Sequence, residues 1–432
     1  MVGILKFKGN AFIGKFFSVL SIDILVKAAG FVLLPFFLRL MTQSEFGLYN
    51  YILSIVQTFS LVLNLGLYVS LSKLYHSYKV QRQKGELLFT IFSSLLVFNI
   101  FFCVIVYFSG VDDWLINILF DNSTDYRNYK AFIGFALVVS VFTFMLTNFF
   151  YTTEKIRQVR AYNVYRIVAI NSLTLLALFL FEGNSVILRL RFTYGIELIL
   201  LIVFSFYFFR EVNVVYKKEM IQKSLKIGLP IMVSAIFGIV VNFSDKFLLQ
   251  KYGSLIDLSN YYLAFSFASI IPLIFTSLQN VWIPVFMKEK DIQKNFEKTK
   301  RLISKLLLIF LILSVSIWLL FDALLWIGVI PLKYNDVIWI LPLLLITQMF
   351  ASLTPLFSNY LVYFEKTSLV SLSGFFVSVV SIFLGLWLIP MWGVLGAAIT
   401  TLVANLIYLV IYYYLVLFLK EKYLVTNRNL SL

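Results

Sequence analysis

The sequence has very little of what most enzymes use for chemistry. Its 432 residues include one cysteine, Cys103, and one histidine, His76. A disulfide needs two cysteines and a structural zinc site needs about four Cys or His ligands, so both are excluded within the chain. Cys103 lies in an apolar run and His76 in a lysine-rich loop, where neither has the surroundings of a reactive group. We therefore expect no catalytic residues, no metal and no cofactor.

Charge is also scarce. Charged residues make up 13% of the chain, roughly half the fraction of a soluble domain, whereas hydrophobic residues make up 61% and aromatic residues 18%. A water-soluble fold has no means of burying that much apolar surface. The composition therefore predicts an all-α polytopic membrane protein.

Apolar stretches follow one another along the chain, each about as long as the roughly 20 residues that cross a bilayer as a helix. The first run has no small-residue cleavage site and is too long for a signal peptide, so it is expected to remain as a membrane helix. The pattern predicts about twelve transmembrane helices, near residues 16–40, 47–72, 87–110, 131–153, 163–182, 188–209, 227–249, 261–287, 304–326, 337–363, 367–389 and 393–419.

The net charge of +15 does not indicate nucleic-acid binding, because the basic residues lie in the gaps between apolar runs. Lysine and arginine are concentrated in alternate gaps and at both ends of the chain, and the intervening gaps hold few. Cytoplasmic loops carry such an excess. The distribution therefore predicts an even number of spans with both termini in the cytoplasm.

An internal repeat divides the chain into halves. The segment RLMTQSEFGLYNY begins at Arg39 and the segment KYGSLIDLSNYYL at Lys251, and each has a basic residue after a helix, a polar turn, and a tyrosine that enters the next helix. Tyr49 corresponds to Tyr261 at the same offset. The match predicts two six-helix lobes, residues 1–215 and 216–432, related as a parallel repeat with a cavity between them.

The two halves carry motifs of a known family. The first half contains FVLLPFFLRLMTQSEFGLYNYILSI and LNLGLYVSLSKL, and the second contains IGLPIMVSAIFGIVVNFSDKFLLQKYGSLIDLSNYYLAFSF and VWIPVFMKE. These segments resemble the Pro-containing first helix, the Gly-Leu-Tyr turn and the mid-helix Asp followed by a basic residue of the Wzx-type oligosaccharide flippases. That family is the polysaccharide-transporter branch of the MATE-like superfamily.

The resemblance implies a MATE-like fold and a function. A flippase of this kind moves undecaprenyl diphosphate carrying a short oligosaccharide across the bacterial inner membrane by alternating access, for O-antigen, capsule or exopolysaccharide synthesis. It also implies a monomer that associates loosely with a polysaccharide polymerase and glycosyltransferases. The chain has no Gly-x-x-x-x-Gly-Lys-Ser/Thr phosphate loop, so the energy is expected from a proton or sodium gradient or from downstream polymerisation.

Ionisable residues inside the predicted spans are the candidate sites for substrate or ion. A charge at a helix centre costs roughly 2.5 to 3.5 kcal/mol on insertion scales unless it faces protein or water. Asp23 and Lys27 are four residues apart in the first span, which places them on one helix face. Lys27 would attract the diphosphate and Asp23 would gate it or bind a coupling ion; the alternative is a structural ion pair.

Five other charged residues complete the candidate set. Asp245 and Lys246 are adjacent, so their side chains leave the helix about 100 degrees apart and are expected on different faces. Arg166 is close enough to a helix end to extend toward the cytoplasmic surface. Arg39 and Lys251 lie near the outward ends of equivalent helices, where they either receive phosphate or anchor the topology.

Three other functions remain as alternatives. A multidrug antiporter of the same superfamily is expected to have acidic residues in its cavity, and Lys27 and Lys246 argue against it. A lipid II flippase shares the anionic carrier but resembles this chain less at the motifs. A glycan polymerase or ligase would normally carry a large outward loop, and the longest outward gap here runs only from Val111 to Asn128.

The first-span pair gives a direct test. We expect Lys27→Ala and Asp23→Ala each to abolish polysaccharide export, because each removes one member of a pair in the transport path. Export is measured as surface polysaccharide, and immunoblots of membrane fractions check that the variants insert at normal levels. Normal export from both variants would contradict this assignment.

Overall fold

A computed structural model describes residues 30–120, 127–289 and 291–430, and within these ranges the secondary structure is helical throughout. The predicted pair Asp23 and Lys27 lies outside the described residues. Contacts divide the chain into a first unit, from residues 29–259, and a second unit, from residues 260–432. The division of the sequence repeat at residues 215 and 216 stays a prediction.

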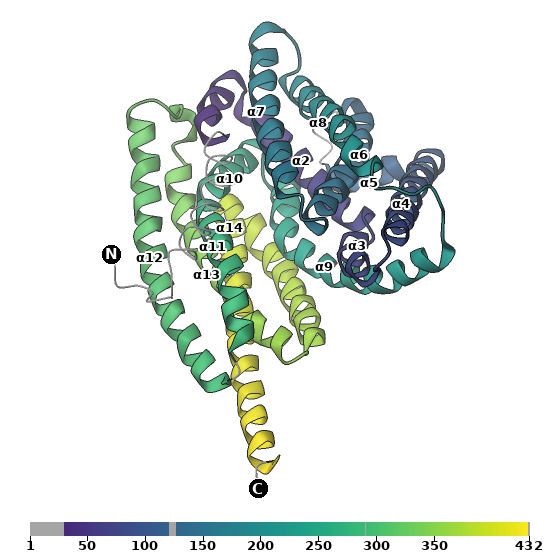
Figure 1. Ribbon diagram of the computed structural model, residues 1–432. Coiled ribbons are helices and arrows are strands. Elements are labelled where there is room, and N and C mark those ends of the chain that lie inside the picture. Colours follow the sequence, from purple (N-terminus) through teal and green to yellow (C-terminus); the bar gives the residue numbers. More distant parts are fainter. Residues whose placement is uncertain (1–29, 121–126, 290, 431–432) are drawn as a thin grey trace. The chain divides into compact units, whose positions relative to one another are not determined.

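The first unit contains helices α2 to α9 and the start of α10 (Figure 1). A short apolar helix, Gly30–Leu40, precedes them. They are α2 (Gln43–Leu63), α3 (Leu67–Ser77), α4 (Gln81–Ser109), α5 (Val111–Leu119), α6 (Arg127–Thr152), α7 (Ile156–Leu180), α8 (Ser185–Phe209), α9 (Lys218–Tyr252) and the start of α10 (Leu255–Ala268).

The second unit contains the end of α10 and the longest helix of the chain. Its central helix is α13, which packs against α11, α12 and α14. The remaining elements of this unit are α11 (Ile270–Lys288), α12 (Ile292–Trp326), a 3-10 turn (Leu332–Tyr334), α13 (Val337–Tyr363) and α14 (Thr367–Leu430).

The prediction of an all-α polytopic membrane protein is confirmed. Ten helical segments among the described residues are long and apolar enough to cross a membrane. They include α7 and α8, where charged residues shorten the apolar runs. Helix α14 covers two predicted spans, and Gly393 divides it with φ 52° and ψ −125°. The total of twelve spans and the orientation of the termini stay predictions.

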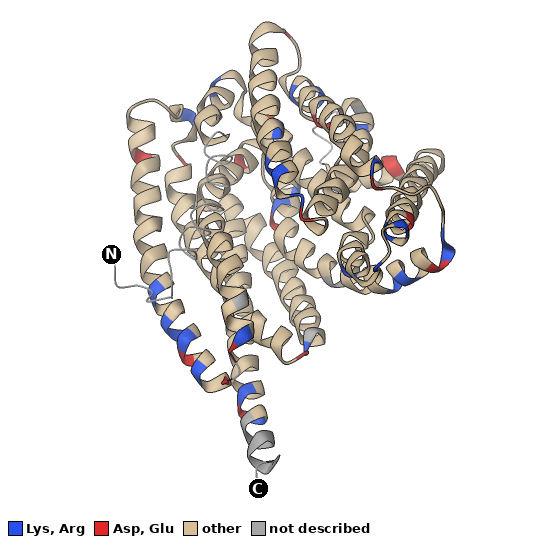
Figure 2. Cartoon of the chain, viewed as in Figure 1, with Lys and Arg blue, Asp and Glu red and all other residues tan. Residues whose placement is uncertain are grey.

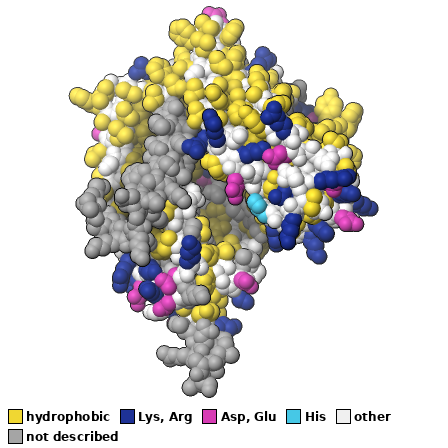
Figure 3. Space-filling view, in the orientation of Figure 1, with side chains coloured by type: hydrophobic (Ala, Val, Ile, Leu, Met, Phe, Trp, Pro, Cys, Tyr) yellow, Lys and Arg dark blue, Asp and Glu magenta, His cyan; other side chains and the backbone are white. Residues whose placement is uncertain are grey.

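Large apolar side chains cover much of the described surface on the face that Figure 3 shows. Trp326 is 88% exposed, Phe108 81% and Phe179 76%. Soluble monomers rarely expose contiguous apolar patches larger than a few hundred Å². This surface therefore suits contact with lipid chains.

The two repeat segments fold in the same way at the start of α2 and of α10. Thr42 and Glu45 form a capping box, in which the Thr42 side chain accepts from the Glu45 N–H and the Glu45 carboxylate accepts from the Thr42 N–H. Ser254 and Asp257 make the same two bonds, at the offset that separates Arg39 from Lys251. Each box satisfies backbone donors that a helix start leaves without a partner.

The repeat extends to a tertiary contact. The hydroxyl of Tyr49 lies 3.1 Å from Thr193 Oγ1 on α8, and the hydroxyl of Tyr261 lies 3.1 Å from Thr401 Oγ1 on α14. All four residues are buried. The aligned tyrosines therefore make equivalent contacts, one between α2 and α8 and the other between α10 and α14.

One predicted span is broken. The stretch 47–72 was expected to be a single helix, but the chain leaves the helical conformation between α2 and α3, where Leu65 has φ 55° and Gly66 has φ 66°. A Cβ at Gly66 would lie 2.2 Å from the Gly228 carbonyl oxygen, and one at Gly228 would lie 2.6 Å from the Leu65 carbonyl oxygen. The segment between α2 and α3 therefore packs against α9 with backbone touching backbone. This close approach leaves no room for a Cβ at Gly66 or at Gly228.

This crossing predicts different effects for two glycines of the same helix. Gly228→Ala is expected to destabilise the protein by about 1 to 3 kcal/mol, because the new methyl group overpacks a backbone contact. Gly238→Ala is the matched control, since a Cβ there meets nothing within 4 Å. Thermal unfolding of the detergent-purified chains measures both, and equal midpoints for the two variants would refute the close crossing.

Candidate functional site in the membrane-spanning helices

A buried ion pair joins α7 and α8 in the first unit. Arg166 Nη2 lies 2.8 Å from Glu197 Oε1. The Glu197 side chain is 2% exposed, whereas that of Arg166 is 40% exposed. The carboxylate is therefore enclosed, and the guanidinium that neutralises it also reaches the surface of the unit.

Sequence reasoning found Arg166 but missed its partner. The extension of Arg166 toward a helix end stays a prediction, and the structure shows that its guanidinium pairs with a residue of the next helix. Glu197 is an acidic residue in the middle of the predicted span 188–209, so the criterion that selected Asp23 and Asp245 would also have selected it. The pairing itself depends on how α7 packs on α8.

Neutral polar groups surround this region of the first unit. The Tyr162 hydroxyl, on α7, donates to Thr143 Oγ1 on α6 at 3.3 Å. Tyr194, one turn before Glu197 on α8, is 3% exposed. The Tyr162 and Thr143 hydroxyls therefore satisfy each other, and the ion pair of Glu197 is the one with Arg166.

A second buried pair lies within α9. Lys246 Nζ is 3.1 Å from Asp245 Oδ1 and 3.3 Å from Asp245 Oδ2, and it donates to the Asn242 carbonyl at 2.6 Å. Asp245 is 1% exposed and Lys246 6%. The expectation that these neighbours face different directions was wrong, because the lysine side chain is long enough to fold back onto the preceding carboxylate.

The predicted outward residues are not buried. Arg39 and Lys251 are both exposed, and the Lys251 ammonium lies 6.0 Å from the centre of the Tyr252 ring. Neither residue is a member of the two ion pairs described above. Their roles as phosphate receptors or topology anchors stay predictions.

A different arginine, on α8, is enclosed by aromatic side chains. Arg189 is 9% exposed, and its guanidinium carbon lies 3.9 Å from the centre of the Tyr49 ring and 4.1 Å from that of Phe37. Stacking on aromatic faces suits the planar, weakly hydrated guanidinium. The sequence did not single out Arg189 as a site residue, because aromatic contacts across helices have no local signature.

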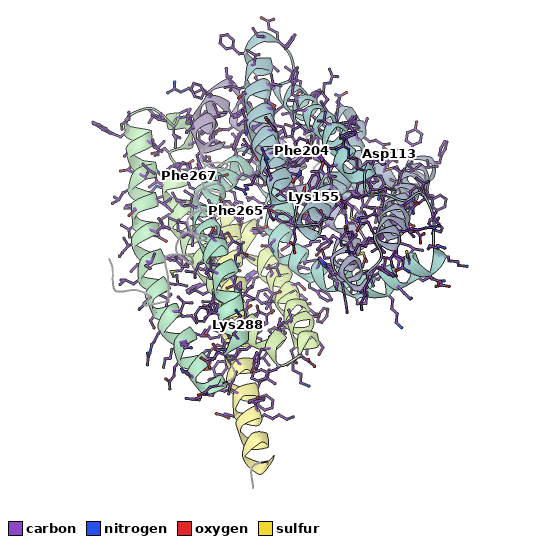
Figure 4. The ribbon with its side chains drawn as sticks, in the orientation of Figure 1. Asp113, Lys155, Phe204, Phe265, Phe267 and Lys288 are labelled. Carbon is purple, nitrogen blue, oxygen red and sulfur yellow. The ribbon has the colours of Figure 1, made fainter. Side chains whose placement is uncertain are left out.

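Basic residues also gather outside the apolar segments. Figure 2 shows lysines and arginines along the first turns of α12, beyond the end of α11 that Lys288 marks in Figure 4. The hydrogen bond from Lys298 lowers the pKa of the Glu289 carboxyl there. In the first unit, Lys155, also labelled in Figure 4, forms an ion pair with Glu211. These charges lie in the gaps that the positive-inside pattern assigns to one side.

The described residues offer no group of three or more His, Cys, Asp or Glu side chains that would hold a metal ion. The chemistry available in the helices is therefore that of ion pairs and neutral hydrogen-bonding groups. Such groups bind and release a polar solute or an ion, and their charges are typical of transport pathways.

Comparison with known families identifies the family of this chain. The model of the polysaccharide biosynthesis protein family matches residues 12–290, which is more than half of the sequence. The chain belongs to this family. No curated protein gives a significant match.

Solved structures show the same fold at low sequence identity. An inward-facing multidrug resistance MATE family transporter of the MOP superfamily has a TM-score of 0.70 and 11% identity, over 93% of this chain and 96% of that one. The lipid II flippase MurJ, in an inward closed conformation, has a TM-score of 0.69 and 15% identity, over 91% and 87%. A MOP superfamily transporter from Pyrococcus furiosus has a TM-score of 0.59 and 12% identity, over 94% of each chain. The fold is that of a MATE-like, MurJ-like transporter.

The Arg166–Glu197 pair makes a quantitative prediction. Arg166→Leu is expected to destabilise the chain by about 2 kcal/mol, below the roughly 3 to 5 kcal/mol of a fully buried pair because Arg166 is partly exposed. The double variant Arg166→Leu/Glu197→Leu should recover most of that loss, since no unpaired charge remains. Thermal unfolding in detergent measures this cycle. A double variant that is less stable than Arg166→Leu would show that Glu197 is not left unpaired in the single variant.

Proposed function

We propose that this multi-pass membrane protein flips undecaprenyl diphosphate-linked oligosaccharide from the cytoplasmic to the outer face of the bacterial inner membrane. The observation that carries the proposal is the match to the polysaccharide biosynthesis family on a flippase-like fold. Family and fold are those of transporters and flippases, which move a solute without changing its covalent structure.

The charged residues of the first unit support an anionic substrate. A diphosphate crosses hydrocarbon only if cations compensate its charge, and a guanidinium binds phosphate oxygens in a bidentate manner. Arg166 combines a buried carboxylate partner with a side chain that is 40% exposed. In the proposed mechanism the diphosphate competes with Glu197 for this guanidinium, so binding and release need no covalent step.

The proposed orientation follows from the basic gaps. Both termini and the lysine-rich start of α12 would lie in the cytoplasm, where the substrate is assembled. We further propose that a proton or sodium gradient or downstream polymerisation drives transport, and that the monomer associates loosely with the polymerase and the glycosyltransferases. The product would then enter O-antigen, capsule or another exopolysaccharide.

Deletion of the gene tests the proposed function. The expected result is loss of surface polysaccharide together with accumulation of undecaprenyl diphosphate-linked oligosaccharide, measured by mass spectrometry of the lipid fraction. Complementation with the unaltered gene is the control. Unchanged lipid intermediates with raised drug sensitivity would instead indicate a multidrug antiporter, and accumulated lipid II would indicate a lipid II flippase.

A further inference from the structure

Two amides and an indole in the second unit leave polar atoms without hydrogen-bond partners. Gln279 Nε2, on α11, donates to Asn359 Oδ1, on α13, at 3.2 Å. Gln279 Oε1, Asn359 Nδ2 and Trp282 Nε1 have no partner, although all three atoms are enclosed. Trp282 is 8% exposed and Asn359 7%. We refer to these three residues as the amide–indole cluster.

Helix spacing places Trp282 beside Gln279 on the face of α11 that packs on α13. Trp282 is one turn after Gln279 on α11 and one turn before Phe286, so the three side chains share a helix face. Phe286 packs edge-on against Tyr360, with ring centres 4.6 Å apart. Tyr360 is the residue that follows Asn359. The same face of α11 therefore meets α13 at both ends of this stretch.

The remaining atoms form a defined chemical set. They are one amide oxygen, which accepts, and one amide nitrogen and one indole nitrogen, which donate. Exchanging the oxygen and nitrogen of both amides leaves the same set of one amide acceptor and one amide donor. A phosphate offers only acceptors, so it would oppose the amide oxygen. A ligand that fits must be neutral and must present both an acceptor and a donor.

The position of the cluster makes these atoms costly to leave unpaired. Gln279 lies about 14 Å from Lys288 along the axis of α11, well inside the apolar part of the helix. Each enclosed polar atom without a partner costs about 1 to 3 kcal/mol. Thr276 and Asn280 on the same helix are exposed, so polar groups continue from the cluster to the surface of the unit.

We propose that the amide–indole cluster binds the acetamido group of an N-acetylated sugar in the transported oligosaccharide. The acetamido N–H would donate to Gln279 Oε1, and its carbonyl would accept from Asn359 Nδ2 and Trp282 Nε1. This inference rests on the proposed function and adds a substrate class to it, since it selects neutral sugars that carry an acylated amine.

Equilibrium binding to the full-length chain in lipid nanodiscs tests the proposal. The ligands are undecaprenyl diphosphate alone, the same carrier with one glucose, and the same carrier with one N-acetylglucosamine. The unaltered chain is expected to bind the N-acetylglucosamine form about tenfold more tightly than the other two, because the acetamido group satisfies the enclosed atoms. Gln279→Leu, Asn359→Leu and Trp282→Phe should each reduce this ratio while changing the affinity for the bare carrier less than twofold.

Two controls keep the test decisive. Gln348→Leu removes another buried amide of α13, about 16 Å further along the helix from Asn359, and should preserve the ratio. The double variant Gln279→Leu/Asn359→Leu removes both partners of the amide–amide hydrogen bond together with their two unpaired atoms, so it should keep or raise the midpoint of thermal unfolding. A lower midpoint would mean that the two amides are structural and would overturn the proposal.

The binding outcomes separate the inference from the function on which it rests. Equal affinity of the unaltered chain for all three ligands, or an unchanged ratio in the three cluster variants, would overturn the sugar site and leave a cluster that holds only water. Equal affinity for the glucose and N-acetylglucosamine forms would overturn the acetamido assignment. Failure to bind even the bare carrier would overturn the proposed function together with the inference.

Discussion

Hydrocarbon offers no hydrogen-bond partner to a backbone carbonyl or an amide and no counter-ion to a charge. The polar groups in the apolar helices of this chain must therefore find partners within the protein. Most of the described backbone is helical, so its amide and carbonyl groups bond within their own helices. Where α2 gives way to α3, the irregular residues Leu65 and Gly66 lie against Gly228 of α9. Non-helical backbone is thus buried in protein, which is the condition under which a membrane tolerates it.

Charged side chains in the apolar helices form ion pairs, either within one helix or between two helices. Asp245 and Lys246 neutralise each other within one helix, so their pairing needs no neighbour. Arg166 and Glu197 belong to different helices and depend on the contact between α7 and α8. The second kind of pair changes when its helices shift or when another anion reaches the arginine, and it is therefore the better candidate for a transport step.

Features with a local signature were predictable from the sequence. The helices, the capping residues and the tyrosines of the repeat all depend on spacing along the chain, and the predicted pairing of Tyr49 with Tyr261 marks equivalent contacts to Thr193 and Thr401. The break at Gly66 was not predictable, since its cause is the approach of another helix. The Asp245–Lys246 pair was missed because helix geometry fixes Cβ directions but not the path of a long side chain.

The two repeats share a scaffold and differ in what they enclose. Four residues before the paired threonine, the first repeat has the buried Arg189 and the second has the buried Ala397. Among the described residues, the two ion pairs with an almost fully buried carboxylate both lie in the first unit, whereas the enclosed groups of the amide–indole cluster in the second unit are neutral. A sugar-bearing lipid diphosphate needs both kinds of group, since only a cation compensates its phosphates and only neutral donors and acceptors distinguish its sugars.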